Sequence, residues 1–234
     1  PTRGDTHMQF DITRSADGID KTLAYTVNPR HRFILLSYKR HLLLEMSGRY
    51  DEIFVPEMTV EHPVYRFHAL GLATQLEGVD QIRALYRSWA ETNQTIFYAE
   101  NTQVAVADNF VATRTIAYQQ VWGPSVLGEK VLGHLPKCMS KPLLLTLLNQ
   151  HGFHPKDECY YLYKSLEETI WPYDDRCRLM SENVWEPEPK DAQLIKLNAD
   201  QVLTTAEVRE KLAPMVEPLP NFDEYVLGKK AAGA

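Results

Sequence analysis

Two long strand-like segments separated by a two-residue turn constrain the fold of this chain more than any other feature. Residues 95–107 and 110–122 are rich in β-branched and aromatic side chains, and Asp108-Asn109 lies between them. This pattern predicts a hairpin of two long antiparallel strands. The same texture returns over residues 159–185, with a turn expected at residues 172–177. A meander of antiparallel strands is therefore expected in the second half of the chain.

The first half of the chain has a helical pattern instead. Apolar residues recur at helical intervals from Arg30 to Met46, with Pro29 suited to the first turn and Gly48 suited to the end. Residues 79–89 repeat that periodicity after an extended segment at residues 58–67. Helices followed by antiparallel strands predict an α+β fold.

The length of 234 residues suits one elaborated domain. We expect residues 1–28 to form an arm over the domain or over a partner subunit, and residues 29–190 to form the domain. Within it, residues 124–157 interrupt the strand pattern and predict a helical insertion that covers one end of the sheet. Residues 191–234 are expected to add a helix, which begins with a capping box at Thr204, and a wrapping tail.

Composition excludes several classes of protein. The net charge is −6 and the Lys and Arg residues are scattered, which argues against a nucleic-acid-binding surface. The three cysteines, Cys138, Cys159 and Cys177, are unclustered, as is typical of a reducing compartment. No apolar run reaches the roughly 20 residues of a membrane span. We therefore expect a cytoplasmic protein without a membrane partner.

Metal and nucleotide chemistry are also not expected. His62 and His68 lack the spacing of helical metal ligands, and His151 with His154 is only a weak alternative. The chain has no Gly-rich phosphate loop and no Gly-x-Ser-x-Gly motif. The sequence thus predicts neither a metal nor a cofactor. The remaining histidines, His41 among them, are expected to be solvated or to cap helices.

Two motifs resemble those of a known superfamily. The segment Thr59-Val-Glu-His-Pro-Val64, with Tyr38 at a matching distance before it, is similar to the SnoaL-like branch of the NTF2-like superfamily, which includes ketosteroid isomerase. Residues 171–179 resemble the final hairpin of that family. The likeness spans about residues 30–186, apart from the insertion. It implies a cone: a strongly curved antiparallel sheet wrapped around a long helix, with an apolar pocket inside.

The resemblance also implies a site. His62 stands where the family has its catalytic Asp, and Tyr38 stands where the family has a phenol that stabilises an oxyanion. Thr169, beside Glu167 and Glu168, stands near the position of the family's second donor, a protonated Asp. Because both acids are replaced, we expect a shared fold but a different reaction.

Because side chains alternate along a strand, His62 is expected on one defined face of its strand. It shares that face with Val64 and Arg66, whereas Tyr65 and Phe67 lie on the other side. If the family's register holds, His62 points into the pocket, where an imidazole with a pKa near 6.5 suits proton abstraction. The alternative is a histidine that only packs within the sheet.

Further side chains are candidates to bind substrate, and the many aromatic rings favour a flat hydrophobic ligand. These candidates are Arg66, Tyr98, Arg114, Tyr118, Trp122, Thr169 and Trp185. Either arginine is expected to orient a phenolate or a carboxylate of the ligand.

The leading hypothesis is a cofactor-independent lyase, a dehydratase or a formaldehyde-releasing enzyme, acting on a small aromatic molecule. Lignin-derived diarylpropane lyases, which resemble this superfamily, would be an example. The alternatives are a double-bond isomerase or polyketide cyclase, and a non-catalytic binding protein. A homodimer or higher homo-oligomer is expected from the family likeness.

Overall fold

The computed structural model describes residues 10–69, 72–123 and 158–229. The expected insertion at residues 124–157 lies outside these residues. The elements, in chain order, are α1 (Asp17–Tyr25), α2 (Pro29–Met46), β1 (Thr59–Ala69), β2 (Leu72–Glu77), α3 (Val79–Glu91), β3 (Phe97–Ala107), β4 (Phe110–Trp122), β5 (Tyr160–Pro172), β6 (Leu179–Trp185), β7 (Gln193–Lys196), α6 (Thr205–Leu212) and α7 (Phe222–Tyr225). Short 3₁₀ helices lie at Ile12–Arg14, Tyr50–Glu52, Pro189–Asp191, Ala199–Gln201 and Ala213–Met215.

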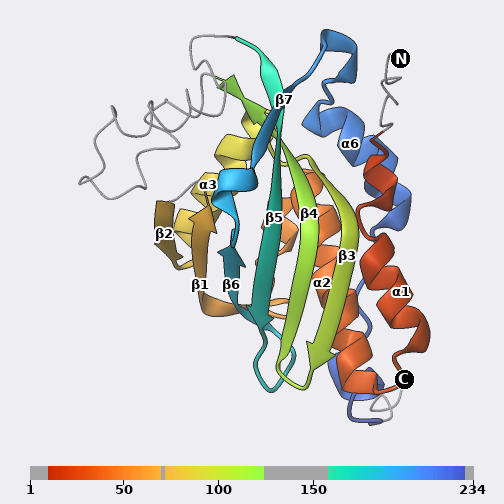
Figure 1. Cartoon of the computed structure of the whole chain (residues 1–234). Helices are drawn as coiled ribbons and strands as arrows, with labels where there is room; N and C mark the ends of the chain where they lie inside the picture. The colour runs from red at the N-terminus through yellow and green to blue at the C-terminus, as the bar shows by residue number, and fades with distance from the viewer. Residues whose placement is uncertain (1–9, 70–71, 124–157, 230–234) are drawn as a thin grey trace.

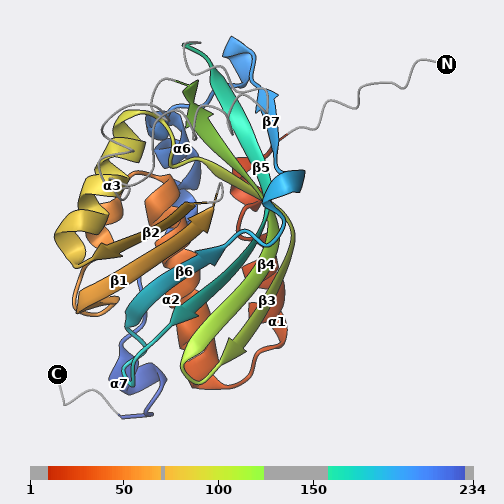
Figure 2. The same ribbon diagram turned by 60° about the vertical axis from the view of Figure 1, so that its left-hand side comes forward.

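The strands form one seven-stranded sheet in the order β2-β1-β6-β5-β4-β3, with β7 paired to β5. All neighbours are antiparallel except β1 and β6, which run parallel. The long strands β3, β4 and β5 curve across α2, as Figures 1 and 2 show from two sides. The hairpin expected around Asp108-Asn109 is confirmed, and so is the α+β fold with a curved sheet around a long helix.

Helix α2 begins and ends where its sequence predicts. Asn28 caps it by accepting a hydrogen bond of 2.9 Å from the backbone N–H of Arg30, and Pro29 occupies the first turn. The Arg30 guanidinium donates to the carbonyl oxygens of Asp108, Asp174 and Asp175. It therefore ties the start of the helix to the β3–β4 and β5–β6 turns, which fixes the helix beneath the sheet.

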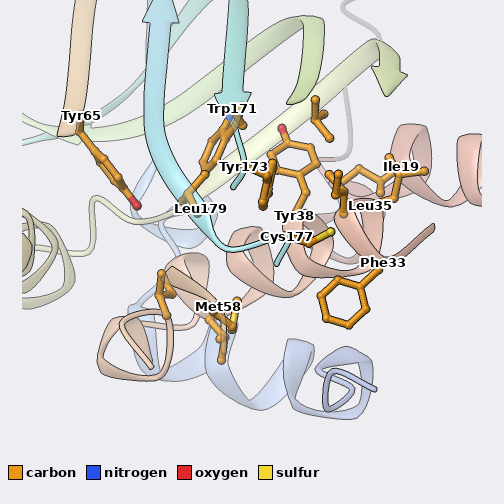
Figure 3. Close-up of a cluster of buried hydrophobic side chains, with 14 of the residues drawn as sticks. Ile19, Phe33, Leu35, Tyr38, Met58, Tyr65, Trp171, Tyr173, Cys177 and Leu179 are labelled. Atoms are coloured by element: carbon orange, nitrogen blue, oxygen red, sulfur yellow. The ribbon is translucent and has the colours of Figure 1, made fainter. Parts of the chain in front are cut away.

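The core lies between α2 and the sheet. Tyr38 of α2 and Trp171 of β5 meet edge to face, with ring centroids 4.9 Å apart, and Figure 3 shows both within the buried cluster. Phe33, also on α2, is 2% exposed and packs against Phe222 of α7. The C-terminal segment thus covers the outer end of α2, in keeping with the expected wrapping tail, and the capping box at Thr204 is confirmed.

Four elements escaped the sequence pattern: α1, β2, β7 and α7. Helix α1 lies in the expected N-terminal arm and packs beside β3 of the same chain (Figure 1). Just before it, the Ser15 hydroxyl donates a 2.8 Å hydrogen bond to the Phe97 carbonyl. The described part of the arm therefore lies over its own domain.

Gly18 is the point of closest approach between α1 and β3, and it gives a first prediction. A Cβ at this position would lie 2.6 Å from Thr102 Cβ and 2.9 Å from the Thr102 carbonyl oxygen. Gly→Ala inside a helix normally stabilises by about 1 kcal/mol. Here we expect Gly18→Ala to lower the free energy of unfolding by about 1–3 kcal/mol, because the helix must move off the sheet. Urea denaturation measures the change.

The double variant Gly18→Ala/Thr102→Gly, compared with Thr102→Gly alone, is the control for that prediction. Glycine at position 102 removes the Cβ and Cγ2 contacts and leaves the carbonyl contact, so Gly18→Ala should cost less stability in this background than in the wild type. A Gly18→Ala protein more stable than the wild type would contradict the packing described here.

Candidate active site

His62, the expected base, lies at the protein surface. Its side chain is 85% exposed, and its Nε2 atom is 4.0 Å from the carboxylate of Glu61, which is equally exposed. The expectation that His62 points into the cone is therefore wrong, and the structure does not bring it to Tyr38. Its part in catalysis stays a prediction.

Strand β1 is irregular where His62 lies. The segment of β1 from Thr59 to Val64 pairs with the shorter segment of β6 from Leu179 to Ser181, so β1 contains extra residues at this point, as in a β-bulge. Beyond the irregularity Tyr65 is fully buried. The predicted alternation is present, but the inward face of β1 carries Pro63 and Tyr65, so His62 lies on the face opposite to the one that the family's register assigns to it.

A cavity of about 110 Å³ lies inside the cone, between α1, α2 and the strands β3 to β6. Its described lining consists of Ser15, Ile19, Tyr38, Leu42, Glu45, Phe97, Tyr98, Ala99, Thr102, Thr113, Thr115, Ala117, Glu167, Thr169, Trp171, Glu182 and Val184. Of the residues predicted for the site, Tyr38, Tyr98 and Thr169 are in this lining. The sequence therefore located part of the pocket, but with other acid–base groups than expected.

Two of the cavity's carboxyl groups belong to a buried network. The Tyr86 hydroxyl lies 3.4 Å from Oε2 of Glu45 and 3.4 Å from Oε2 of Glu182. His41 Nε2 lies 3.2 Å from the same hydroxyl and 3.6 Å from Glu45 Oε2. His41 is only 2% exposed, so the expectation that it is solvated or capping is wrong. One phenol thus connects two acids and an imidazole.

Glu167 is the third carboxyl group in the cavity, on the inward face of β5. The Ser165 hydroxyl donates to its Oε1 at 3.2 Å. Burial, together with the nearby charges of Glu186 and Glu45, raises the pKa of Glu167 to about 7. Burial and the Glu45 charge also raise the pKa of Glu182 well above its usual value. The cavity therefore contains carboxyl groups that hold protons near neutral pH.

Neutral hydrogen-bonding groups also line the cavity. Burial raises the pKa of Tyr38, so its phenol stays protonated and able to donate. The hydroxyls of Thr113 and Thr169 are 2.6 Å apart, and Trp171 Nε1 donates to the Thr169 hydroxyl at 2.8 Å. These contacts hold Thr169 in place beside the cavity, between the inward-facing neighbours Glu167 and Trp171 on β5.

The two arginines expected to hold the ligand lie outside the cone. Arg66 donates to the side chains of Gln75 and Asn183, at 3.0 Å and 3.2 Å. Arg114 is 54% exposed at its side chain and lies 3.6 Å from the Glu168 carboxylate. Both alternate with inward-facing neighbours on their strands, so their expected placement in the pocket was wrong because the opposite face of each strand turns inward.

The three remaining aromatic candidates do not line the cavity either. Trp185 is 52% exposed and stacks on His68 on the outer surface of the sheet. Tyr118 is buried in a second cluster, where its hydroxyl donates to Glu100 at 2.9 Å. Trp122 lies at the far end of β4. This cavity therefore does not support their expected contacts with a substrate, which stay a prediction.

Sequence reasoning overlooked His41, Glu45 and Glu182, yet a signal for the first two was present. Tyr38, His41 and Glu45 are three and four residues apart, so they share one face of α2. If Tyr38 lines the pocket, His41 and Glu45 are therefore expected to face it as well. Glu182 precedes Val184 on the inward face of β6, which only the sheet register shows.

The described residues contain no group of three His, Cys, Asp or Glu side chains placed to hold a metal ion. Within the same ranges no helix is long and apolar enough to cross a membrane.

The fold and the cavity together define an α+β protein in which a curved, mostly antiparallel sheet wraps a long helix around an acidic interior. No model of a known protein family matches the chain, and neither does a curated protein sequence. Among solved structures, the chain is similar to a phenazine biosynthesis-related protein from Pseudomonas aeruginosa, with 13% identity over 81% of this chain and 92% of that chain and a TM-score of 0.36.

Two further solved structures are similar to the chain, with comparably low identities and TM-scores. A hexachlorocyclohexane dehydrochlorinase from Novosphingobium barchaimii has 11% identity over 70% of this chain and 86% of its own, with a TM-score of 0.38. A protein from Kribbella flavida has 12% identity over 70% and 97%, with a TM-score of 0.34. Identities and TM-scores this low say nothing about the substrate or reaction of this chain.

Proposed function

We propose that this protein is a cofactor-independent enzyme that performs acid–base chemistry on a small molecule inside the cone. One observation carries the proposal: three glutamates, Glu45, Glu167 and Glu182, converge on a cavity that also holds the phenol of Tyr38. Carboxyl groups are rarely buried without a cation unless they serve a function, since burying them costs stability.

Glu167 is the proposed acid–base group. A pKa of about 7 gives it both protonation states at neutral pH, which is the condition under which a general base works best. It takes a proton from carbon or from a hydroxyl group and returns it to another atom of the substrate. Tyr38 donates a hydrogen bond to the negative charge that develops, and Thr169 orients the substrate. His62, which lies at the surface, has no part in this scheme.

Elimination is the reaction class we favour, so the enzyme would be a lyase of the dehydratase type. In such a step Glu167 removes a proton while a protonated carboxyl group, Glu182, helps hydroxide leave as water. A double-bond isomerase would use the same groups with a carbonyl substrate. A cavity of about 110 Å³ is smaller than the roughly 150 Å³ that accommodates benzene. An aromatic substrate would therefore place only its reacting end in the cavity unless the walls widen.

A spectrophotometric screen tests this proposal. Small diols, aromatic diols and enones are offered to the purified wild type and to Glu167→Gln. We expect turnover of at least one diol by the wild type and its loss in the variant. Turnover of enones alone would make the protein an isomerase, and turnover that survives in the variant would refute the role of Glu167.

The exposed outer face of the sheet supports the proposal of a homo-oligomer. Ile170 and Trp185 are 51% and 52% exposed on neighbouring strands, and Phe110 is 37% exposed. Exposed large apolar side chains grouped on one face are typical of an interface. We expect a dimer by light scattering that Ile170→Lys converts to monomer, with Lys164→Ala as the control. A wild-type monomer would contradict this proposal.

A further inference from the structure

The N-terminal helix α1 contributes one side chain to the wall of the cavity. Among the described lining residues only Ile19 belongs to this helix, and it is 2% exposed. Ser15, just before the helix, also lines the cavity, but its hydroxyl already donates to the Phe97 carbonyl. The helix therefore closes its side of the cavity with an aliphatic group, which lies in the same buried cluster as Tyr38 (Figure 3).

Contacts with the sheet and with α2 hold α1 in place. Gly18 lies so close to β3 that a Cβ at this position would be 2.9 Å from the Thr102 carbonyl oxygen. The Arg32 guanidinium of α2 donates to the carbonyl oxygens of Leu23 and Thr26, at 2.7 Å and 2.9 Å. Because Gly18 already lies against the strand, the helix cannot approach the sheet further. A smaller side chain beside it would therefore leave a space that the helix does not fill.

The volume of the cavity lies below that of a benzene-sized site. It is about 110 Å³, which is the space of about three or four water molecules. An apolar cavity of about 150 Å³ in another protein binds benzene. Ile19→Ala removes three carbon atoms, or roughly 90 Å³ if each carbon takes the space of one water molecule. The cavity would then reach about 200 Å³, which is enough for an aromatic ring.

We propose that α1 sets the size limit of the substrate: Gly18 seats the helix against β3, and Ile19 excludes an aromatic ring from the cavity. This inference deepens the proposed function and rests on it for placing the reaction in this cavity. The reacting part of the substrate is then an aliphatic group of about three or four non-hydrogen atoms, such as the diol end of a short alkane. Ile19 determines specificity and takes no part in the chemistry.

Binding of phenol and of ethane-1,2-diol to the whole protein tests the inference, with the indole N–H signal of Trp171 in NMR spectra as the readout. Trp171 lines the cavity and its Nε1 donates to the Thr169 hydroxyl, so a molecule that enters should shift this signal. In the wild type we expect a shift with the diol and none with phenol. Ile19→Ala should bind phenol more tightly than the wild type does, by about tenfold or more.

Two further variants separate the role of α1 from the effect of any truncation. Gly18→Ala keeps every lining side chain but moves α1 off β3, so it should admit phenol as well. Leu23→Ala shortens another buried side chain of the same helix, one that is not in the described lining, and should exclude phenol as the wild type does. Gly18→Ala also decides the question if Ile19→Ala does not fold.

Several results would overturn the inference. They are phenol binding to the wild type as tightly as to Ile19→Ala, exclusion of phenol from a folded Ile19→Ala or Gly18→Ala, equal entry of phenol into Leu23→Ala, and failure of the diol to enter the wild type. If a small diol is turned over by a Glu167-dependent reaction while the α1 variants exclude phenol, the proposed function stands and this inference alone falls. If phenol enters only the Gly18 and Ile19 variants and no diol is turned over, the size limit stands and the proposed reaction falls.

Discussion

Replacing Glu167 with glutamine is expected to lower kcat by about 10²–10⁴-fold, the usual contribution of a general acid or base. The amide keeps the size of the side chain and can still accept a hydrogen bond from Ser165, which now lies 3.2 Å from Glu167 Oε1. It cannot take up a proton at neutral pH. The fall should therefore appear in kcat rather than in KM, in an assay of the substrate that the screen identifies.

Two surface variants are the controls. Glu168→Gln alters the next residue of β5, whose carboxylate faces Arg114 outside the cone. His62→Gln alters the residue that stands where the family has its catalytic Asp and that was expected to be the base. Both should keep kcat within about twofold of the wild type, since neither side chain lines the cavity. A large loss in His62→Gln with little loss in Glu167→Gln would reverse the assignment made here.

The second large effect concerns stability and pH. The pKa of Glu167 is about 7 in the folded protein and 4.5 without the fold, so the folded chain holds this proton over a range in which the unfolded chain has lost it. Stability must therefore fall as pH rises through that window, by about 2–3 kcal/mol for this group. Glu182, whose pKa is also raised, contributes with the same sign.

Urea denaturation between about pH 4.5 and about pH 8 measures this effect. The carboxyl groups whose pKa is lowered, such as Asp174 and Asp11, act below that window and do not obscure it. In Glu167→Gln the free energy of unfolding should fall less between these pH values, because the contribution of Glu167 is missing. In Glu168→Gln it should fall as much as in the wild type. A slope that is the same in the wild type and Glu167→Gln would show that Glu167 titrates normally.

Local sequence patterns predicted most of the fold, because the elements are locally consistent. The cap at Asn28, the periodicity of α2 and the Asp108-Asn109 turn each point to the structure that forms. Helix α1 was overlooked because it is only nine residues long and one of its faces is polar. Its position is set by the close packing of Gly18 on Thr102, a tertiary contact that no local pattern predicts.

The site was harder to predict because it depends on which face of each strand turns inward. Alternation was correct for β1, but Thr59, Pro63 and Tyr65 form its buried face, so His62 lies on the outer face. A family likeness assigns residue positions but does not show which face of a strand is buried. Tyr38 and Thr169 were placed correctly since α2 and β5 are regular through these positions.

In the proposed mechanism Glu167, a partly buried glutamate with a raised pKa, performs the chemistry inside the cone. The most direct measurement compares two titrations: the carboxyl carbon of Glu167 followed by NMR, and the pH dependence of kcat/KM. We predict that both have a midpoint near the same pH, about 7, and that Glu167→Gln lacks the NMR signal and the corresponding step in the rate. A Glu167 signal that titrates in the ordinary range of a surface glutamate, or a rate profile with no step at its midpoint, would contradict this mechanism.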